Sequence, residues 1–220
     1  LNAAVKDMYA IAGERSGGGN PDWLAQAQPA TAHAAAVTRI LAAGATIVGL
    51  EPSCLLSLRD EFLVMGLGES AEQLSTRALM IEEFLAREHK DGRLRLPLQA
   101  LPQKKALVHG HCHQKAFDVL NPVVAVLRLI PELQVEVVES SCCGMAGSFG
   151  YEAAHYEVSM KMAEAALLPA VRKADADTLI VADGTSCRHQ IADGTRASRQ
   201  AVHAIRVLAG ALAPGRSDGS

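Results

Sequence analysis

The sequence lacks an excess of charge of either sign. Lys and Arg together number 21 against 24 Asp and Glu, so the formal net charge is −3. A chain with this balance has no basic footprint for neutralising phosphates, so we expect no nucleic-acid partner. Hydrophobic residues make up 49% of the sequence and charged residues 20%, which excludes a disordered chain and predicts a globular one.

The sequence also lacks a long apolar run. Its longest stretch without Asp, Glu, Lys or Arg, residues 23–38, contains Pro29, His33 and two glutamines. A membrane-spanning helix needs about 20 predominantly apolar residues, so we expect no transmembrane segment. No secretory signal opens the chain. We therefore expect a reducing, cytoplasmic location, with peripheral association at the inner membrane as the alternative.

Short apolar runs alternate with stretches of helical spacing. The runs, each followed by turn residues, predict strands at 46–50, 106–110, 135–139 and 178–182. The intervening spacing predicts helices at 34–43, 55–65, 71–89, 114–129, 151–170 and 195–213. Pro122 predicts a break in the fourth of these helices. The alternation predicts an α/β fold with a mainly parallel sheet and flanking helices.

The expected domain organisation follows from this pattern. Because the chain begins with Leu1 in a helical stretch, we expect it to be a fragment of a larger product. Residues 1–30 are expected to form an N-terminal helix and linker, the end of a preceding region. We expect residues 31–212 to form the α/β domain and residues 213–220 to be a disordered tail.

Cysteines are the most informative residues of this chain. Their number, five, is odd, which argues against a fully paired disulfide framework. Each follows a predicted strand at the turn into the next helix: Cys54, Cys112, Cys142, Cys143 and Cys187. In a parallel sheet these turns share the carboxyl edge, where open α/β folds bind ligands. We therefore expect cysteines that are distant in sequence to meet in space.

Three kinds of site compete for these cysteines. A disulfide between the neighbours Cys142 and Cys143 would form a strained ring. Zinc usually takes its thiolates from Cys-x-x-Cys pairs, and the sequence lacks such a pair. An iron–sulfur cluster spreads several irons over a few ångströms, so adjacent thiolates can bind neighbouring irons. Cysteines that stay reduced as part of the core are a further alternative.

Glycines follow the cysteine pair in the motif CCGMAGSFG. Gly144 and Gly147 leave the backbone free to curl, so that its N–H groups can point at cluster sulfides. Such hydrogen bonds stabilise negative charge. We therefore count both glycines as candidate cofactor-binding residues.

Histidines also lie beside the cysteines. We expect His111 and His113, which flank Cys112, to orient or hydrogen-bond a ligand. His109 lies in a predicted strand and is interpreted as a core residue. His189 is a candidate substitute for a missing thiolate.

The cysteine motifs resemble a known family. Cys112, the sequence Cys142-Cys143-Gly144 and Cys187 resemble the cysteine-rich CCG domain found in heterodisulfide reductase and in the iron–sulfur subunit of glycolate oxidase. HGHCHQKA, CCGMAGSFGYE and DGTSCRHQI, with EPSC around Cys54, are more similar to the C-terminal end of bacterial FAD-linked oxidases fused to an iron–sulfur oxidoreductase. The resemblance covers roughly residues 46–212.

The resemblance implies a ligand set and a cofactor. Cys112, Cys142, Cys143 and Cys187 would bind an iron–sulfur cluster of the 4Fe-4S type, with Cys54 as a fifth ligand or a redox thiol. The family pattern of heterodisulfide reductase closes with Cys-x-x-Cys, whereas Cys187 is followed here by Arg, His and Gln. This departure leaves the type of cluster open.

The resemblance also implies a function. The parent enzyme would oxidise a 2-hydroxy acid such as lactate, glycolate or 2-hydroxyglutarate at an FAD held by another domain or subunit. This chain would then relay electrons from the flavin to a quinone or another carrier, without holding the flavin site. The alternative is a zinc-binding or thiol–disulfide module that docks a flavoprotein partner.

Overall fold

The computed structural model describes residues 25–28, 44–64, 68–147 and 149–213. The chain divides into two compact units, Leu1–Met80 and Ile81–Ser220. The helix predicted at 34–43, the domain boundary expected near residue 30 and the expected tail at 213–220, except Ala213, lie outside the described residues. Within the described part, no helix is both long and apolar enough to cross a membrane.

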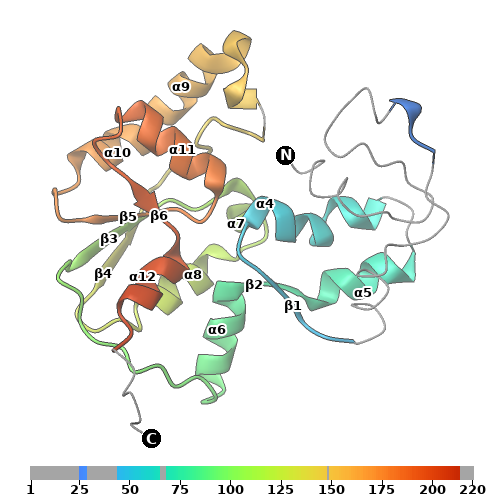
Figure 1. The fold of residues 1–220 in the computed structure, drawn as a ribbon, viewed down its shortest axis with the longest axis horizontal. Helices are drawn as coiled ribbons and strands as arrows, with labels where there is room; N and C mark the ends of the chain where they lie inside the picture. The colour runs from blue at the N-terminus through green and yellow to red at the C-terminus, as the bar shows by residue number, and fades with distance from the viewer. Residues whose placement is uncertain (1–24, 29–43, 65–67, 148, 214–220) are drawn as a thin grey trace, which may run out of the picture. The chain divides into compact units, whose positions relative to one another are not determined.

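A four-stranded parallel sheet forms the centre of the larger unit. Its strand order is β4-β3-β5-β6, and its strands are β3 (Lys105–Val108), β4 (Gln134–Val137), β5 (Leu179–Val181) and β6 (Ala201–Val202). Every pair in this sheet is parallel. The predicted fold class, a parallel sheet with flanking helices, is confirmed (Figure 1).

Alternating side chains of the central strands enter two different cores. Ala106 and Val108 of β3, with Val181 of β5, pack against α8 (Leu120–Leu127) and α12 (Ala204–Gly210). This alternation is the two-residue period of a strand whose faces are both covered. α6 (Ile81–Lys90) adds partly buried side chains to the same core.

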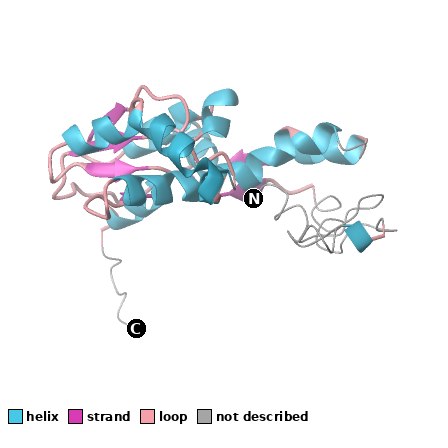
Figure 2. Cartoon of the chain, turned by 90° about the horizontal axis from the view of Figure 1, so that it is seen from above, coloured by secondary structure: helices cyan, strands magenta, loops and turns pink. Residues whose placement is uncertain are grey.

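The hydrophobic core on the other face of the sheet includes two of the cysteines. Ile180 of β5 packs there with buried side chains of α10 (Leu167–Lys173) and α11 (Thr185–Gly194), and with Cys143 and Cys187. α9 (Tyr156–Glu164) packs beside α10 and α11. Helices therefore cover both sides of this sheet, as Figure 2 also shows.

The smaller unit contains a separate two-stranded parallel sheet. Its elements are β1 (Ile47–Gly49), α4 (Pro52–Leu55), the 3₁₀ turns η1 (Leu56–Arg59) and η2 (Glu61–Val64), α5 (Glu69–Arg77) and β2 (Ala78–Met80). Phe62, Ala71 and Leu74 form its small core. The single helix predicted at 55–65 is therefore wrong, because residues 56–59 and 61–64 fold as two separate 3₁₀ turns.

The single helix predicted at 71–89 is also wrong. The segment consists of α5, then strand β2, then α6. Ala78 and Met80 are completely buried, and the strand pairs in parallel with β1. The helical spacing continues across this strand, but pairing with β1 and burial override the local helix preference.

Two further helices are divided. The break predicted by Pro122 falls earlier, between α7 (Cys112–Ala116) and α8, where Asp118 has a positive φ of 54°. Pro122 lies in the first turn of α8, where its missing N–H has no intrahelical partner to lose. The helix predicted at 151–170 becomes α9 and α10, preceded by the 3₁₀ turns η3 (Phe149–Tyr151) and η4 (Ala153–His155).

The helix predicted at 195–213 begins too early. α11 ends at Gly194, strand β6 follows, and α12 begins at Ala204. The end of α11 is a Schellman motif: the Ala197 N–H donates to the Ala192 carbonyl at 2.6 Å and the Arg196 N–H donates to the Asp193 carbonyl at 2.9 Å. Glycine usually occupies the left-handed position of this motif. Here Arg196 occupies it with a φ of 51°, so the sequence does not mark the end of the helix.

This motif generates a stability prediction. Replacing Arg196 with Gly removes the steric strain of a left-handed arginine, so R196G is expected to raise the free energy of unfolding by about 0.5–1 kcal/mol. R206G, in the interior of α12, is the matched control and is expected to lower it by about 1 kcal/mol. Urea-induced unfolding followed by circular dichroism measures both changes. Equal destabilisation by the two variants would contradict this account of the helix end.

Candidate metal centre

Four of the five cysteines lie at the carboxyl edge of the four-stranded sheet. Cys112 is the first residue of α7 after β3, Cys142 and Cys143 follow β4, and Cys187 lies in the first turn of α11 after β5. The convergence expected from the strand positions therefore occurs for these four residues. Cys54 lies in α4 of the other unit.

The four thiols form a row of contacts. Cys112 is hydrogen-bonded to Cys142, Cys142 to Cys143, and Cys143 to Cys187. Hydrogen bonds from its two thiol neighbours hold the pKa of Cys142 well below its usual range. Cys143 likewise lowers the pKa of Cys187. The pKa values of Cys112 and Cys143 are raised, because both donate their S–H protons to these two acceptors.

Backbone N–H groups also stabilise the Cys142 thiolate. The Gly144 N–H donates to Cys142 Sγ at 3.2 Å, and the Ala146 backbone contributes in the same sense. Gly144 has a φ of +94°, and a Cβ there would lie 2.1 Å from the Ser159 carbonyl oxygen. Only glycine fits this position. Gly147 also has a positive φ, of 70°, but its role at the site stays a prediction.

His111 organises the turn that carries Cys112. Its Nδ1 accepts the His113 N–H at 3.2 Å, and its own N–H donates to Gln114 Oε1 at 3.0 Å, which together form a capping box for α7. The rings of His111 and His113 are 5.3 Å apart. A Cβ on Gly184 would lie 2.5 Å from His111 Cδ2 and 3.2 Å from Cys187 Sγ, so this glycine keeps a narrow space open between them.

His109 lies closer to the thiols than the sequence suggests. It is buried, as expected of a core residue, and its Nδ1 is 2.9 Å from Ser140 Oγ. Its buried Nε2 has no hydrogen bond of normal geometry in the described part of the chain. One ring nitrogen of His109 and the sulfurs of Cys143 and Cys187 all lie within 4.8 Å of one another. The position of His109 at the end of a predicted strand was the one sequence feature that could have indicated its contact with the thiols.

Lys115 and Gln114 are site residues that sequence reasoning missed. The Lys115 ammonium donates to the Ser141 carbonyl at 2.7 Å, and its burial lowers its pKa against the opposite effect of the nearby thiols. Gln114 Nε2 donates to Asp183 Oδ2 at 2.7 Å. The capping pattern His-x-x-Gln was the one signal for Gln114.

Two predicted site residues are not among these contacts. His189 is exposed, and its Nδ1 is 2.7 Å from the Tyr151 hydroxyl. Cys54 is half-buried, and burial raises the pKa of its thiol. A ligand role for either residue stays a prediction.

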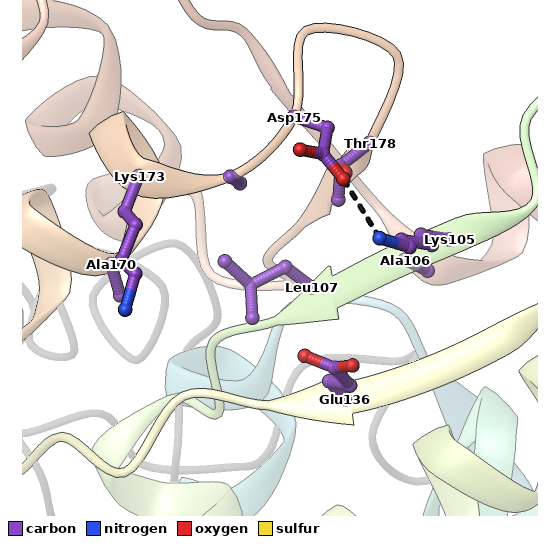
Figure 3. A pocket seen from close by; sticks show the side chains of 9 residues that line it. Lys105, Ala106, Leu107, Glu136, Ala170, Lys173, Asp175 and Thr178 are labelled. Carbon is purple, nitrogen blue, oxygen red and sulfur yellow. Dashed lines mark hydrogen bonds and ion pairs between the residues drawn. The ribbon is translucent and has the colours of Figure 1, made fainter.

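One hollow beside this sheet lies away from the cysteines. It has a volume of about 310 Å³ and lies beside the first residues of β3, next to α10, where Lys105 pairs with Asp175 at 2.7 Å (Figure 3). The cysteines follow the opposite ends of the strands. Neighbouring thiols of the row contact one another, as the ligands of a bound inorganic centre do.

The pKa pattern generates a reactivity prediction for the reduced, metal-free chain. Because Cys142 is a thiolate throughout, its alkylation by iodoacetamide is expected to proceed at nearly the same rate at pH 5.5 and pH 8.5. Cys54 and the more exposed Cys112 have raised pKa values, so their rates are expected to rise about tenfold per pH unit. Peptide mapping by mass spectrometry measures all three. A Cys142 rate that rises in parallel with that of Cys54 would refute the proposed proton arrangement.

Relatives of this chain are found among dehydrogenase components. No family model and no solved structure matches it. It is 32% identical over 170 residues to one subunit of the anaerobic glycerol-3-phosphate dehydrogenase of Escherichia coli (strain K12), covering 77% of this chain and 41% of that protein. It is 28% identical over 156 residues to D-2-hydroxyglutarate dehydrogenase of the same strain, covering 70% of this chain and 14% of that protein.

A shorter match links the chain to a different class of protein. It is 38% identical over 71 residues to Amidase 1 of Arabidopsis thaliana, which covers 32% of this chain. The two dehydrogenase matches are more than twice as long. The chain is thus related to dehydrogenase components, and it spans less than half the length of these relatives.

Proposed function

We propose that this chain is the iron–sulfur electron-transfer module of an FAD-linked oxidoreductase. The observation that carries the proposal is the row of four contacting thiols, Cys112, Cys142, Cys143 and Cys187, in a chain related to dehydrogenase components. When bound, a cluster of the 4Fe-4S type would supply reversible one-electron transfer. The CCG motif around Cys142 supports this assignment.

The residues of the site fit such a group. All four candidate ligands are soft thiolate donors, which iron–sulfur clusters use. His109 Nε2 is buried without a hydrogen bond of normal geometry beside Cys187, and Gly184 keeps open a space that a Cβ would fill. The Gly144 N–H and the Lys115 ammonium supply positive charge beside the thiolates.

The adjacency of Cys142 and Cys143 supports a multi-iron cluster over zinc. Zinc usually takes its thiolates from Cys-x-x-Cys pairs, which this sequence lacks, whereas neighbouring thiolates can bind neighbouring irons. Contact between successive thiols is also compatible with one zinc ion, whose four sulfurs lie about 3.8 Å from one another because each Zn–S bond is about 2.3 Å. Zinc binding by a structural or docking module is the alternative that the first experiment below tests.

The chain's own residues prepare the site in three ways. The capping box at His111 fixes the orientation of Cys112, the Gly144 turn directs backbone N–H groups at Cys142, and the helix N-terminus of α11 adds positive potential at Cys187. The surrounding core excludes water from Cys143 and Cys187. These contacts hold the thiolates in place before any metal binds.

The substrate and partners of the parent enzyme are also part of the proposal. Both dehydrogenase relatives are named for substrates with a secondary alcohol, and one of these is a 2-hydroxy acid. We assign the flavin, which would accept electrons from a 2-hydroxy acid, to a separate domain or subunit. A quinone or another carrier would accept them from this module, in the cytoplasm or peripherally at the inner membrane.

The proposal predicts the metal content of the chain. Anaerobic reconstitution with Fe²⁺ and sulfide is expected to give about four irons and four acid-labile sulfides per chain, with visible absorbance that reduction bleaches. Iron and sulfide assays with electron paramagnetic resonance measure this. Stoichiometric zinc without labile sulfide, in protein purified anaerobically, would reject the cluster.

Serine variants assign the ligands. C112S, C142S, C143S and C187S are each expected to lower bound iron by at least half, because each removes a thiolate. C54S tests the fifth ligand: unchanged iron content with an altered resonance spectrum would make Cys54 a ligand. An unchanged resonance spectrum in C54S would exclude Cys54 and leave four cysteine ligands.

Gly184 provides a test that leaves every candidate ligand in place. G184A puts a methyl group 3.2 Å from Cys187 Sγ and 2.5 Å from His111, so it is expected to lower reconstituted iron several-fold. G210A is the matched control, because a Cβ there meets nothing within 4 Å and full loading is expected. Equal loading of the two variants would show that the space beside Gly184 is not part of the site.

A further inference from the structure

A second group of potential ligands lies apart from the thiols in the same unit. Glu82 is in the first turn of α6, Asp183 follows β5, and His203 is the N-cap of α12. Their exposed fractions are 0%, 2% and 9%, and one donor atom from each lies within 4.8 Å of the other two. Polar side chains from α6, from the segment after β5 and from the start of α12 thus meet in one buried cluster.

Glu82 is the unusual member of this group. Both of its carboxylate oxygens are buried, and neither makes a hydrogen bond of normal geometry in the described part of the chain. Burial, followed by the charge of Asp183, raises the pKa of Glu82 to about 9. Removing a carboxylate from water without a partner is costly, so this side chain needs a cation or a proton.

The spacing of the donor atoms suits a metal ion. Asp183 Oδ1 is 3.3 Å from His203 Nδ1, which is 3.7 Å from Glu82 Oε1. A tetrahedral ion with bonds of about 2.1 Å places neighbouring donors about 3.4 Å apart. The two observed distances lie on either side of this value.

The existing hydrogen bonds leave room for coordination. The Asp183 oxygens each accept one bond, from Gln114 Nε2 at 2.7 Å and from the Ala204 N–H at 2.9 Å, and each keeps a second lone pair. His203 Nδ1 accepts the Ile205 N–H at 3.1 Å, so an ion at this nitrogen would replace that capping bond. Glu82 loses no hydrogen bond.

We propose that Glu82, Asp183 and His203 form a second metal site, which binds a divalent first-row ion such as Mn²⁺, Fe²⁺ or Zn²⁺. Two carboxylates and an imidazole are hard to borderline ligands, unlike the soft thiolates of the first site. A divalent cation would displace the proton of Glu82 and balance the two carboxylate charges that result. The site does not depend on the proposed cluster.

A bound ion would also stabilise the thiol site. Asp183 is hydrogen-bonded to Gln114, whose Oε1 accepts the His111 N–H at the turn that carries Cys112. An ion that fixes Asp183 therefore fixes this chain of contacts. Ligand binding to the folded state alone raises stability as RT ln(1 + [L]/Kd).

Mn²⁺ is the probe, because it prefers oxygen and imidazole donors and leaves thiolates largely free. The loss of the free-ion resonance signal, measured on the full reduced chain without iron or sulfide, is expected to show one Mn²⁺ per chain. E82Q, which keeps the shape of the side chain and removes its charge, is expected to weaken binding at least tenfold. E157Q, an exposed carboxylate in α9, is the matched control and should bind as the parent chain does.

A second measurement separates loss of the site from loss of the fold. Saturating Mn²⁺ is expected to raise the melting temperature of the parent chain and of E157Q, but not that of E82Q. E82Q without metal should melt no lower than the metal-free parent, because it removes an unpaired buried carboxyl. No binding at millimolar Mn²⁺ would leave a proton as the occupant and overturn the proposal. Equal binding by E82Q would also overturn it.

Discussion

The buried carboxylate of Asp183 joins the elements on which the site depends. It lies between the end of β5 and the start of α11, and it accepts hydrogen bonds from Gln114 of α7 and from the N–H of Ala204 in α12. A buried carboxylate is stable only with such partners, and a buried donor left unpaired costs about 1–3 kcal/mol. These hydrogen bonds tie the starts of α7, α11 and α12 to one another. Two of them carry Cys112 and Cys187.

Two histidines cap helix N-termini in the same way at this edge of the sheet. His111 and His203 are both N-cap residues whose Nδ1 accepts the backbone N–H two residues later, at 3.2 Å and 3.1 Å. Each cap satisfies a free donor of a helix N-terminus and directs the rest of the ring toward a group of potential ligands. A helix N-terminus also favours negative charge. The same caps therefore serve helix stability and the stabilisation of anionic ligands.

The fold class and the meeting of four cysteines could be predicted from sequence, because both follow from where strands end. The segment boundaries could not. β2 lies inside a run with helical spacing, and its strand conformation depends on pairing with β1, which is a non-local contact. The end of α11 was missed because Arg196 occupies a position that glycine usually takes.

At the candidate site, too, some features could be predicted from the sequence and others could not. Cysteines are recognisable by type, so Cys112 and Cys187 could be named in advance. The roles of His109, Asp183 and Glu82 arise from burial beside particular neighbours, and no local pattern encodes that. His109 was correctly expected to be buried, yet its contact with Cys143 and Cys187 depends on three strands ending together. Residues that act through neighbours become visible only in the folded chain.

Charge explains why a cation would be favourable at both proposed groups of ligands. In the thiol row, Cys142 and Cys187 accept hydrogen bonds while Cys112 and Cys143 keep their protons, because four adjacent thiolates would repel one another. Lys115 and the backbone N–H groups offset part of this negative charge. Metal binding at the proposed thiol site would displace the remaining S–H protons, so it would release protons and be favoured at higher pH. At both proposed sites, protons on the donor groups would therefore compete with metal ions.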